Sequence, residues 1–172
     1  MLAAAEGLSP GRHRMPIFRA IEKSSMHIAQ TRLSIDTAPR EIKEITAEVA
    51  RWVGQQPIAV GLLTVYLPHT SASLLIQENA SADVLRDLDT FLRRLVPEDI
   101  ALYRHNDQGP DDMPAHIKSA LTQTQLTIPV TDGQIQLGVW QGIFLLEHRA
   151  TPHTRSLILT LIGEDRDQPP AR

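Results

Sequence analysis

The chain of 172 residues is 42% hydrophobic, carries a net charge of -3 and contains no cysteine. That length suits one domain with a substantial core, and the lack of cysteine excludes disulfides, thiolate metal sites and a cysteine nucleophile, which favours a cytoplasmic location. The slightly negative charge predicts no nucleic-acid partner, and because no apolar run reaches roughly 18 residues we expect no membrane partner.

The chain divides into three predicted segments. Residues 1–14 combine glycine, proline and basic residues without the apolar stretch of a signal peptide, so we expect a flexible N-terminal extension. Residues 15–164 are expected to form a single domain, and residues 165–172 a C-terminal tail.

The domain begins with predicted strands and a helix. Apolar residues alternate at 17–21 and 27–35, as they do in strands. Residues 39–53 repeat apolar side chains at helical spacing, and Asp36 or Thr37 can cap this helix.

In the middle of the domain, the sequence predicts a strand, a bend, another strand and a second helix. Residues 58–67 are apolar and β-branched enough for a central strand, and a polar bend at 68–73 leads to the apolar residues 74–76 of another strand. Ser81 can cap the second helix and Pro97 ends it. The side chains expected to point inward from this helix are Val84, Leu85, Leu88, Phe91, Leu92 and Leu95.

In the last part of the domain, the sequence predicts a short helix at 114–121, followed only by strands. Residues 126–137 contain two alternating runs around Asp132-Gly133, which is a strong hairpin signal. Residues 143–146 and 155–162 are further apolar strands, the latter ended by the glycine that follows it.

The sum is seven to eight strands and two to three helices, with strands in hairpin-linked pairs rather than in β-α-β alternation. This order predicts an α+β domain built on a mostly antiparallel β-sandwich. Residues 103–149 concentrate ionisable and amide side chains, which we expect at the strand ends.

Two sets of residues are candidates for a metal site. The first set is His69, His105 and His116. Three imidazoles that meet in space form a catalytic type of zinc site, although this spacing matches no sequence motif. The second set, suited to magnesium, is Asp107, Asp111 and Asp112. Local hydrogen bonds and helix capping are the alternative for both sets.

Cationic and aromatic residues indicate a phosphorylated ligand. Lys118, Arg149 and Arg155 match phosphate oxygens, unless they are ordinary surface charges. Trp140 and Gln141 lie between two glycines, which indicates close approach of a ligand or another chain, or else a tryptophan packed in the core.

Several polar and glycine-rich motifs follow one another along the domain. They are residues 69–74, Glu78-Asn79, residues 111–118, the Asp-Gly hairpin leading to residues 138–142, residues 147–149 and Gly163-Glu164. With these motifs in unbroken order, residues 15–164 resemble the YjbQ family, and the whole series is far more specific than any single motif.

Three positions depart from the family pattern. Val139 replaces the usual threonine before Trp140, and Gln125 replaces a serine at the start of the hairpin. Residues 79–82 read Asn-Ala-Ser-Ala in place of Asn-x-Asp-Pro. If the family threonine contacts the ligand, Val139 weakens the implied site; if it faces the core, nothing changes.

The resemblance implies a compact α+β fold and a homotrimer with a pocket near a subunit boundary. Some members are credited with a secondary thiamine-phosphate synthase activity, which joins hydroxymethylpyrimidine diphosphate to thiazole phosphate and releases pyrophosphate. Negative charge grows on the leaving diphosphate in such a step, so a divalent metal (zinc or magnesium) or cationic side chains must stabilise it.

These expectations assign a role to each candidate residue. The catalytic candidates are His105, His116, Lys118 and Glu147. The substrate-binding candidates are Thr70, Ser71, Asn79, Trp140, Gln141 and Arg149. The metal candidates are His69, His105 and His116. The same residues also fit a non-catalytic trimeric binder of a phosphorylated metabolite, or a metal-dependent hydrolase.

Overall fold

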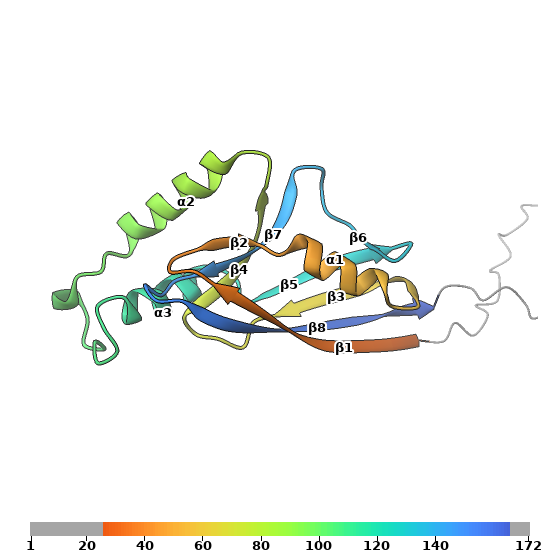
Figure 1. Cartoon of the computed structure of the whole chain (residues 1–172), viewed down its shortest axis with the longest axis horizontal. Coiled ribbons are helices and arrows are strands. Elements are labelled where there is room, and N and C mark those ends of the chain that lie inside the picture. The colour runs from red at the N-terminus through yellow and green to blue at the C-terminus, as the bar shows by residue number, and fades with distance from the viewer. Residues whose placement is uncertain (1–25, 166–172) are drawn as a thin grey trace, which may run out of the picture.

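The computed structural model describes residues 26–165, which form an α+β domain of two antiparallel sheets and three α-helices (Figure 1). The strands are β1 (Met26–Thr37), β2 (Ile42–Glu44), β3 (Ile58–Tyr66), β4 (Ala72–Glu78), β5 (Gln125–Thr131), β6 (Gln134–Ile135), β7 (Gln141–Glu147) and β8 (His153–Asp165). The helices are α1 (Thr46–Gly54), α2 (Ala82–Leu95), the short 3-10 helix η1 (Ile100–Leu102) and α3 (Asp112–Leu121). The predicted extension at 1–14, the predicted strand at 17–21 and residues 166–172 lie outside the described residues.

Both sheets contribute side chains to one hydrophobic core. The larger sheet has the strand order β1-β8-β3-β5-β6 and the smaller one β2-β7-β4, and all neighbouring strands are antiparallel. Alternate residues of β8, such as Leu157 and Leu159, pack in the same cluster as Leu74 of β4 and Ile143 of β7. This arrangement confirms the predicted antiparallel sandwich.

Helix α2 covers less of the sheet than its sequence pattern predicts. Ser81 caps it as expected, because its side chain accepts a hydrogen bond from the N–H of Asp83 at 3.3 Å. Leu92 packs on Phe144 and neighbouring residues of β7, but Phe91 and Leu95, both expected inward, are exposed. The contact with the smaller sheet is made by Leu92 together with the partly buried Leu85 and Leu88.

The predicted helix at 39–53 is wrong in its first part. Ile42–Glu44 forms β2, because its backbone pairs with that of β7, and helix α1 begins only at Thr46. Asp36 and Thr37 lie in β1, and the helix cap is Ile45, which makes no side-chain capping hydrogen bond.

The hairpin prediction is confirmed, whereas the predicted end of the last strand is wrong. Asp132 and Gly133 turn the chain between β5 and β6 with φ values of 52° and 70°. Gly163 does not end β8, because it pairs with Gly61 of β3 on one side and His27 of β1 on the other. Within residues 26–165, no helix combines the length and the hydrophobicity needed to span a membrane.

Candidate metal centre

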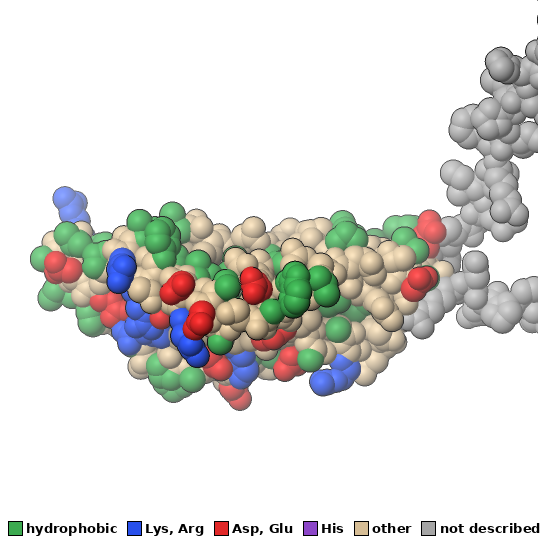
Figure 2. All heavy atoms as spheres, turned by 90° about the horizontal axis from the view of Figure 1, so that it is seen from above, with side chains coloured by type: hydrophobic (Ala, Val, Ile, Leu, Met, Phe, Trp, Pro, Cys, Tyr) green, Lys and Arg blue, Asp and Glu red, His purple; other side chains and the backbone are tan. Residues whose placement is uncertain are grey.

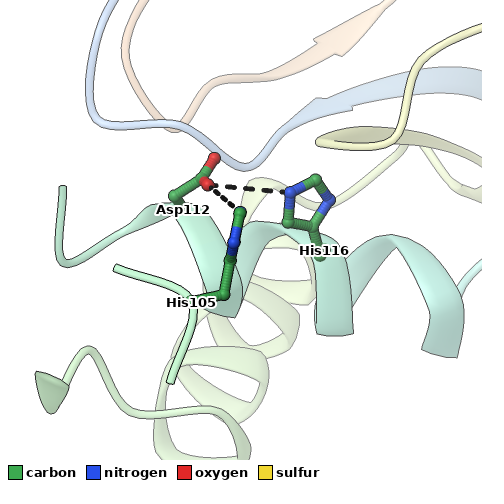
Figure 3. Close-up of side chains that lie close together, drawn as sticks. All are labelled: His105, Asp112 and His116. Carbon is green, nitrogen blue, oxygen red and sulfur yellow. Dashed lines mark ion pairs between the residues drawn. The ribbon is translucent and has the colours of Figure 1, made fainter. Parts of the chain in front are cut away.

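Helix α3 and the loop before it bring together two histidines and one aspartate. Asp112 and His116 stand four residues apart in α3 and therefore project from the same face of the helix. His105 comes from the segment that follows η1, and its ring approaches the same carboxylate (Figure 3). One ligand atom from each of the three residues lies within 4.8 Å of the other two.

The carboxylate of Asp112 presents one oxygen to both imidazoles. Asp112 Oδ2 lies 2.8 Å from His105 Nε2 and 3.7 Å from His116 Nε2. Although the first distance is short, no donor among the described residues is aligned to hydrogen-bond this buried oxygen. A buried carboxylate oxygen without a donor is costly, so the arrangement favours a cation as its partner.

The tautomer of His116 supports the same conclusion. Its Nδ1 lies 2.9 Å from the carbonyl oxygen of Thr70, which can only accept a hydrogen bond. Nδ1 therefore carries the proton, and in the neutral ring the lone pair of Nε2 faces Asp112. Metal-ligating histidines are commonly oriented in this way by a backbone carbonyl on the other ring nitrogen.

Arg149 fixes the carboxylates of this centre instead of facing outward. Its Nη1 donates to Asp112 Oδ1 at 2.7 Å, its Nε to Asp111 Oδ2 at 2.9 Å and its Nη2 to the carbonyl of Gln108 at 2.9 Å. Burial by itself would raise the pKa of Asp111, but hydrogen bonds from the Ala150 N–H and from Arg149 outweigh it and lower that pKa. Because all three guanidinium nitrogens donate hydrogen bonds, Arg149 orients Asp112 so that its Oδ2 faces the two imidazoles, where a metal could bind.

The donor set fits a transition metal better than magnesium. Two imidazole nitrogens and one carboxylate oxygen are usual zinc ligands, and a tetrahedral zinc site separates its ligand atoms by about 3.3 Å, between the two distances found here. The side chain of Asp112 is 2% exposed and that of His105 is 48% exposed, so the centre is closed on one side and open on the other. Of the predicted magnesium set, Asp107 is exposed and Asp111 is held by Arg149.

His69, expected as the third imidazole of the centre, belongs to another group of side chains. Its Nε2 accepts a hydrogen bond from the backbone N–H of Ser156 at 3.0 Å. Burial and then the charge of nearby Arg155 lower the pKa of its ring. Asp112 takes the expected place of His69, and the spacing Asp-x-x-x-His on one helix face was the sequence signal for it.

Glu147 lies in a buried ion pair with Arg155. Arg155 donates to the two carboxylate oxygens at 2.7 and 2.5 Å, and Thr37 Oγ1 donates to one of them at 2.8 Å. Burial would raise the pKa of Glu147, but the hydrogen bonds from Arg155, from the Arg149 N–H and from Thr37 together lower it. Ser71 Oγ accepts from the same guanidinium at 3.2 Å, so this network joins strand ends rather than lining the metal centre.

Asn79, Trp140 and Gln141 form a separate corner at the start of β7. The Asn79 N–H donates to the carbonyl of Trp140 at 3.0 Å, and Gln141 Oε1 accepts from the Gly138 N–H at 2.8 Å. Trp140 is 63% exposed. The alternative interpretation of its flanking glycines, a tryptophan packed in the core, is therefore wrong. Lys118 lies two residues beyond His116 and therefore on the opposite side of α3.

Comparisons of the sequence with known proteins find relatives along most of the chain. A family model described as UPF0047 protein YjbQ-like matches residues 31–164. A UPF0047 protein of Synechocystis sp. is 49% identical over 132 residues, which covers 77% of this chain and 90% of the relative. The UPF0047 protein YjbQ of Escherichia coli O157:H7 is 42% identical over 136 residues, which covers 78% and 98%.

Solved structures share the fold. A YbjQ-like protein of unknown function from Sulfolobus solfataricus superimposes with a TM-score of 0.75 at 23% identity, covering 81% of this chain and 100% of that one. An uncharacterized conserved protein of the YjbQ/UPF0047 family from Clostridium acetobutylicum gives a TM-score of 0.69 at 31% identity, covering 76% and 98%. Because the family model matches most of the chain and the relatives match it over nearly their whole length, the chain belongs to the YjbQ-like UPF0047 family.

Proposed function

We propose that this protein is a metal-dependent enzyme that acts on a phosphorylated small molecule at the centre of His105, Asp112 and His116. The observation that carries the proposal is the buried Asp112 Oδ2, which faces two imidazole nitrogens and has no aligned donor within residues 26–165. Two nitrogens and one carboxylate oxygen leave an open position for substrate or water on a zinc-type metal.

Each residue of the centre has a distinct task in this proposal. A divalent cation, when bound, supplies a Lewis acid that stabilises negative charge on a phosphoryl oxygen. The Thr70 carbonyl holds the ring of His116, and Arg149 holds Asp112 through its other oxygen. His105, with its half-exposed side chain, lies on the side from which a substrate reaches the centre.

The resemblance to the YjbQ family specifies the reaction further as thiamine-phosphate synthesis. Joining hydroxymethylpyrimidine diphosphate to thiazole phosphate expels pyrophosphate, whose growing charge a cation in this position would stabilise. A metal-dependent hydrolase would use the same centre with water as the acceptor, and a non-catalytic binder would use it for recognition alone.

The first test is metal binding by the full chain. Protein purified without added metal is analysed for its elements, and the metal-free protein is then titrated with zinc and with magnesium. We expect one zinc per chain, and His105→Ala should weaken zinc binding by about a hundredfold, since it removes a ligand. His27→Ala is the matched control, because His27 has a similarly exposed side chain, 46%, at the start of strand β1.

The second test is turnover of the two thiamine precursors by the zinc-loaded and metal-free chains. Thiamine phosphate formed by the wild type and lost in His105→Ala supports the synthase. Release of phosphate or pyrophosphate without the second precursor identifies a hydrolase instead, and precursor binding without turnover identifies a binder. Equal zinc affinity in His105→Ala and the wild type contradicts the proposed centre itself.

A further inference from the structure

Lys118 is a buried lysine whose ammonium group lacks a partner in the structure. It lies in α3 and is 5% exposed. Within residues 26–165, its Nζ forms no hydrogen bond and no ion pair. A buried charge without a partner is unfavourable, and it therefore calls for an explanation other than packing.

The acidic groups around Lys118 are already bound to other cations. Glu98 receives two hydrogen bonds from Arg40, at 3.2 and 2.5 Å. Asp89 accepts from Arg93 at 2.7 Å, and the Glu147 carboxylate is taken by Arg155, as described above. Each of these carboxylates is thus paired with an arginine, and the positive charge of Lys118 remains unbalanced.

His148 cannot balance this charge either. Its ring is buried beside Lys118, and burial followed by the lysine charge lowers its pKa to about 4, so the ring is neutral at neutral pH. Its Nε2 lies 2.8 Å from Ser73 Oγ, which occupies that nitrogen.

Lys118 forms part of the wall of two adjoining spaces. One is a small, partly open cavity of about 10 Å³ bordered by Arg40, Leu146 and His148, which has room for about one water molecule. The other is an open groove of about 240 Å³ bordered by Arg93, Pro97 and Glu98. Charges of both signs are interspersed over the neighbouring face that carries α2 (Figure 2), so the lysine is not one member of a broad basic surface.

We propose that this groove is a binding site for a phosphate group, with Lys118 as its buried ammonium contact and Arg93 at its rim. A phosphate oxyanion supplies the charge and the hydrogen-bond acceptors that the ammonium lacks, and charge-assisted contacts of this kind are among the strongest hydrogen bonds in proteins. The adjoining cavity has room for a water that would complete the shell of the ammonium group.

The site is separate from the metal centre and does not depend on the proposed metal-dependent function. His116 and Lys118 are two residues apart in one helix, which places their side chains about 200° apart around its axis. A phosphate group in the groove therefore lies across α3 from the centre of His105 and Asp112.

The test measures binding of inorganic phosphate by the full chain, in the presence of a metal chelator, by isothermal titration calorimetry. We expect one site, and Lys118→Met should weaken binding by about ten- to a hundredfold, as loss of a charge-assisted contact does. Lys43→Met is the matched control, since Lys43 is the other lysine of residues 26–165 and reaches the Asp36 carbonyl elsewhere. A phosphomonoester, phenyl phosphate, is titrated in parallel.

A second readout follows the lysine itself. The chain has three lysines, so the Lys118 ammonium signal in ¹⁵N NMR is assigned by its loss in Lys118→Met. Phosphate should shift this signal. Tighter binding of phenyl phosphate assigns the groove to a phosphorylated metabolite, and tighter binding of the inorganic ion assigns it to free phosphate. The site is overturned if both lysine variants bind phosphate with equal affinity, or if phosphate leaves the Lys118 signal unmoved. Loss of phosphate binding in His105→Ala would join the site to the metal centre and overturn their separation.

Discussion

His148 links the stability of the protein to pH. The residue is 5% exposed, and burial, helped by the charges of Lys118 and Arg155, lowers its pKa from 6.5 to about 4. Between these two values the unfolded chain binds a proton that the folded chain excludes. Stability therefore falls as the pH is lowered from 6.5 towards 4, by roughly 3 kcal/mol if His148 acted alone.

Urea unfolding at a series of pH values checks this prediction. His148→Gln keeps a hydrogen-bonding group for Ser73 but removes the titration, so the loss of stability across this range should become smaller. His69, whose pKa is also lowered, leaves a residual slope. The lowered pKa values of Asp111 and Glu147 add a further loss at lower pH still, as their carboxylates take up protons. An unchanged pH dependence in His148→Gln, with His27→Gln as exposed control, would refute the assignment.

At the scale of single residues, the sequence identified part of the centre. His105 and His116 are candidates because imidazoles that meet in space suit a metal. The role of Arg149 was not foreseen. Whether a guanidinium meets solvent, a phosphate or two aspartates depends on where the β7–β8 loop meets the start of α3, which is a tertiary contact without a local signature.

At the scale of elements, a pair of glycines lets strands β3 and β8 approach closely. Gly61 and Gly163 face each other across the two strands. A Cβ on Gly163 would lie 2.6 Å from the Cα of Gly61 and would also collide with the backbone oxygen of Val60. Gly163→Ala should therefore destabilise the protein by about 1–3 kcal/mol, as overpacking does when backbone must move.

Thermal and urea unfolding of the alanine variants measure this effect. Gly54→Ala is the matched control, because a Cβ at the end of helix α1 meets nothing within 4 Å. That substitution should leave stability unchanged or raise it by about 0.5–1 kcal/mol. Equal stability of Gly163→Ala and the wild type would mean that the strands can separate at this point without cost.

Elements with strong local signals were predictable, and those defined by pairing were not. The Ser81 cap of α2 and the Asp132-Gly133 turn depend on a few adjacent residues, and the structure has both. The sequence predicts helix at β2 because Ile42 and Ile45 also fit helical spacing. Its extended form comes from hydrogen bonds to β7, a strand about a hundred residues later, which no local pattern contains.

At the scale of the whole molecule, the outer face of the larger sheet carries an apolar row. Ile28, Ile162 and Leu62 stand side by side on β1, β8 and β3, and they are 67%, 41% and 49% exposed. Adjacent apolar side chains on a flat sheet face are typical of an interface. We propose that a second copy of this chain covers the row, in the homotrimer that the family resemblance implies.

Leu62→Glu tests this assembly, because it places a charge in the middle of the row without entering the core. Light scattering after size exclusion should give three chain masses for the wild type and one for Leu62→Glu, since burying three unpaired carboxylates between copies is unfavourable. Val139→Glu adds the same charge at an apolar residue that is 85% exposed in the β6–β7 loop, and it should stay trimeric. Circular dichroism establishes that both variants are folded. A monomeric wild type, or a Leu62→Glu variant that keeps three chain masses, would assign the row to something other than self-association.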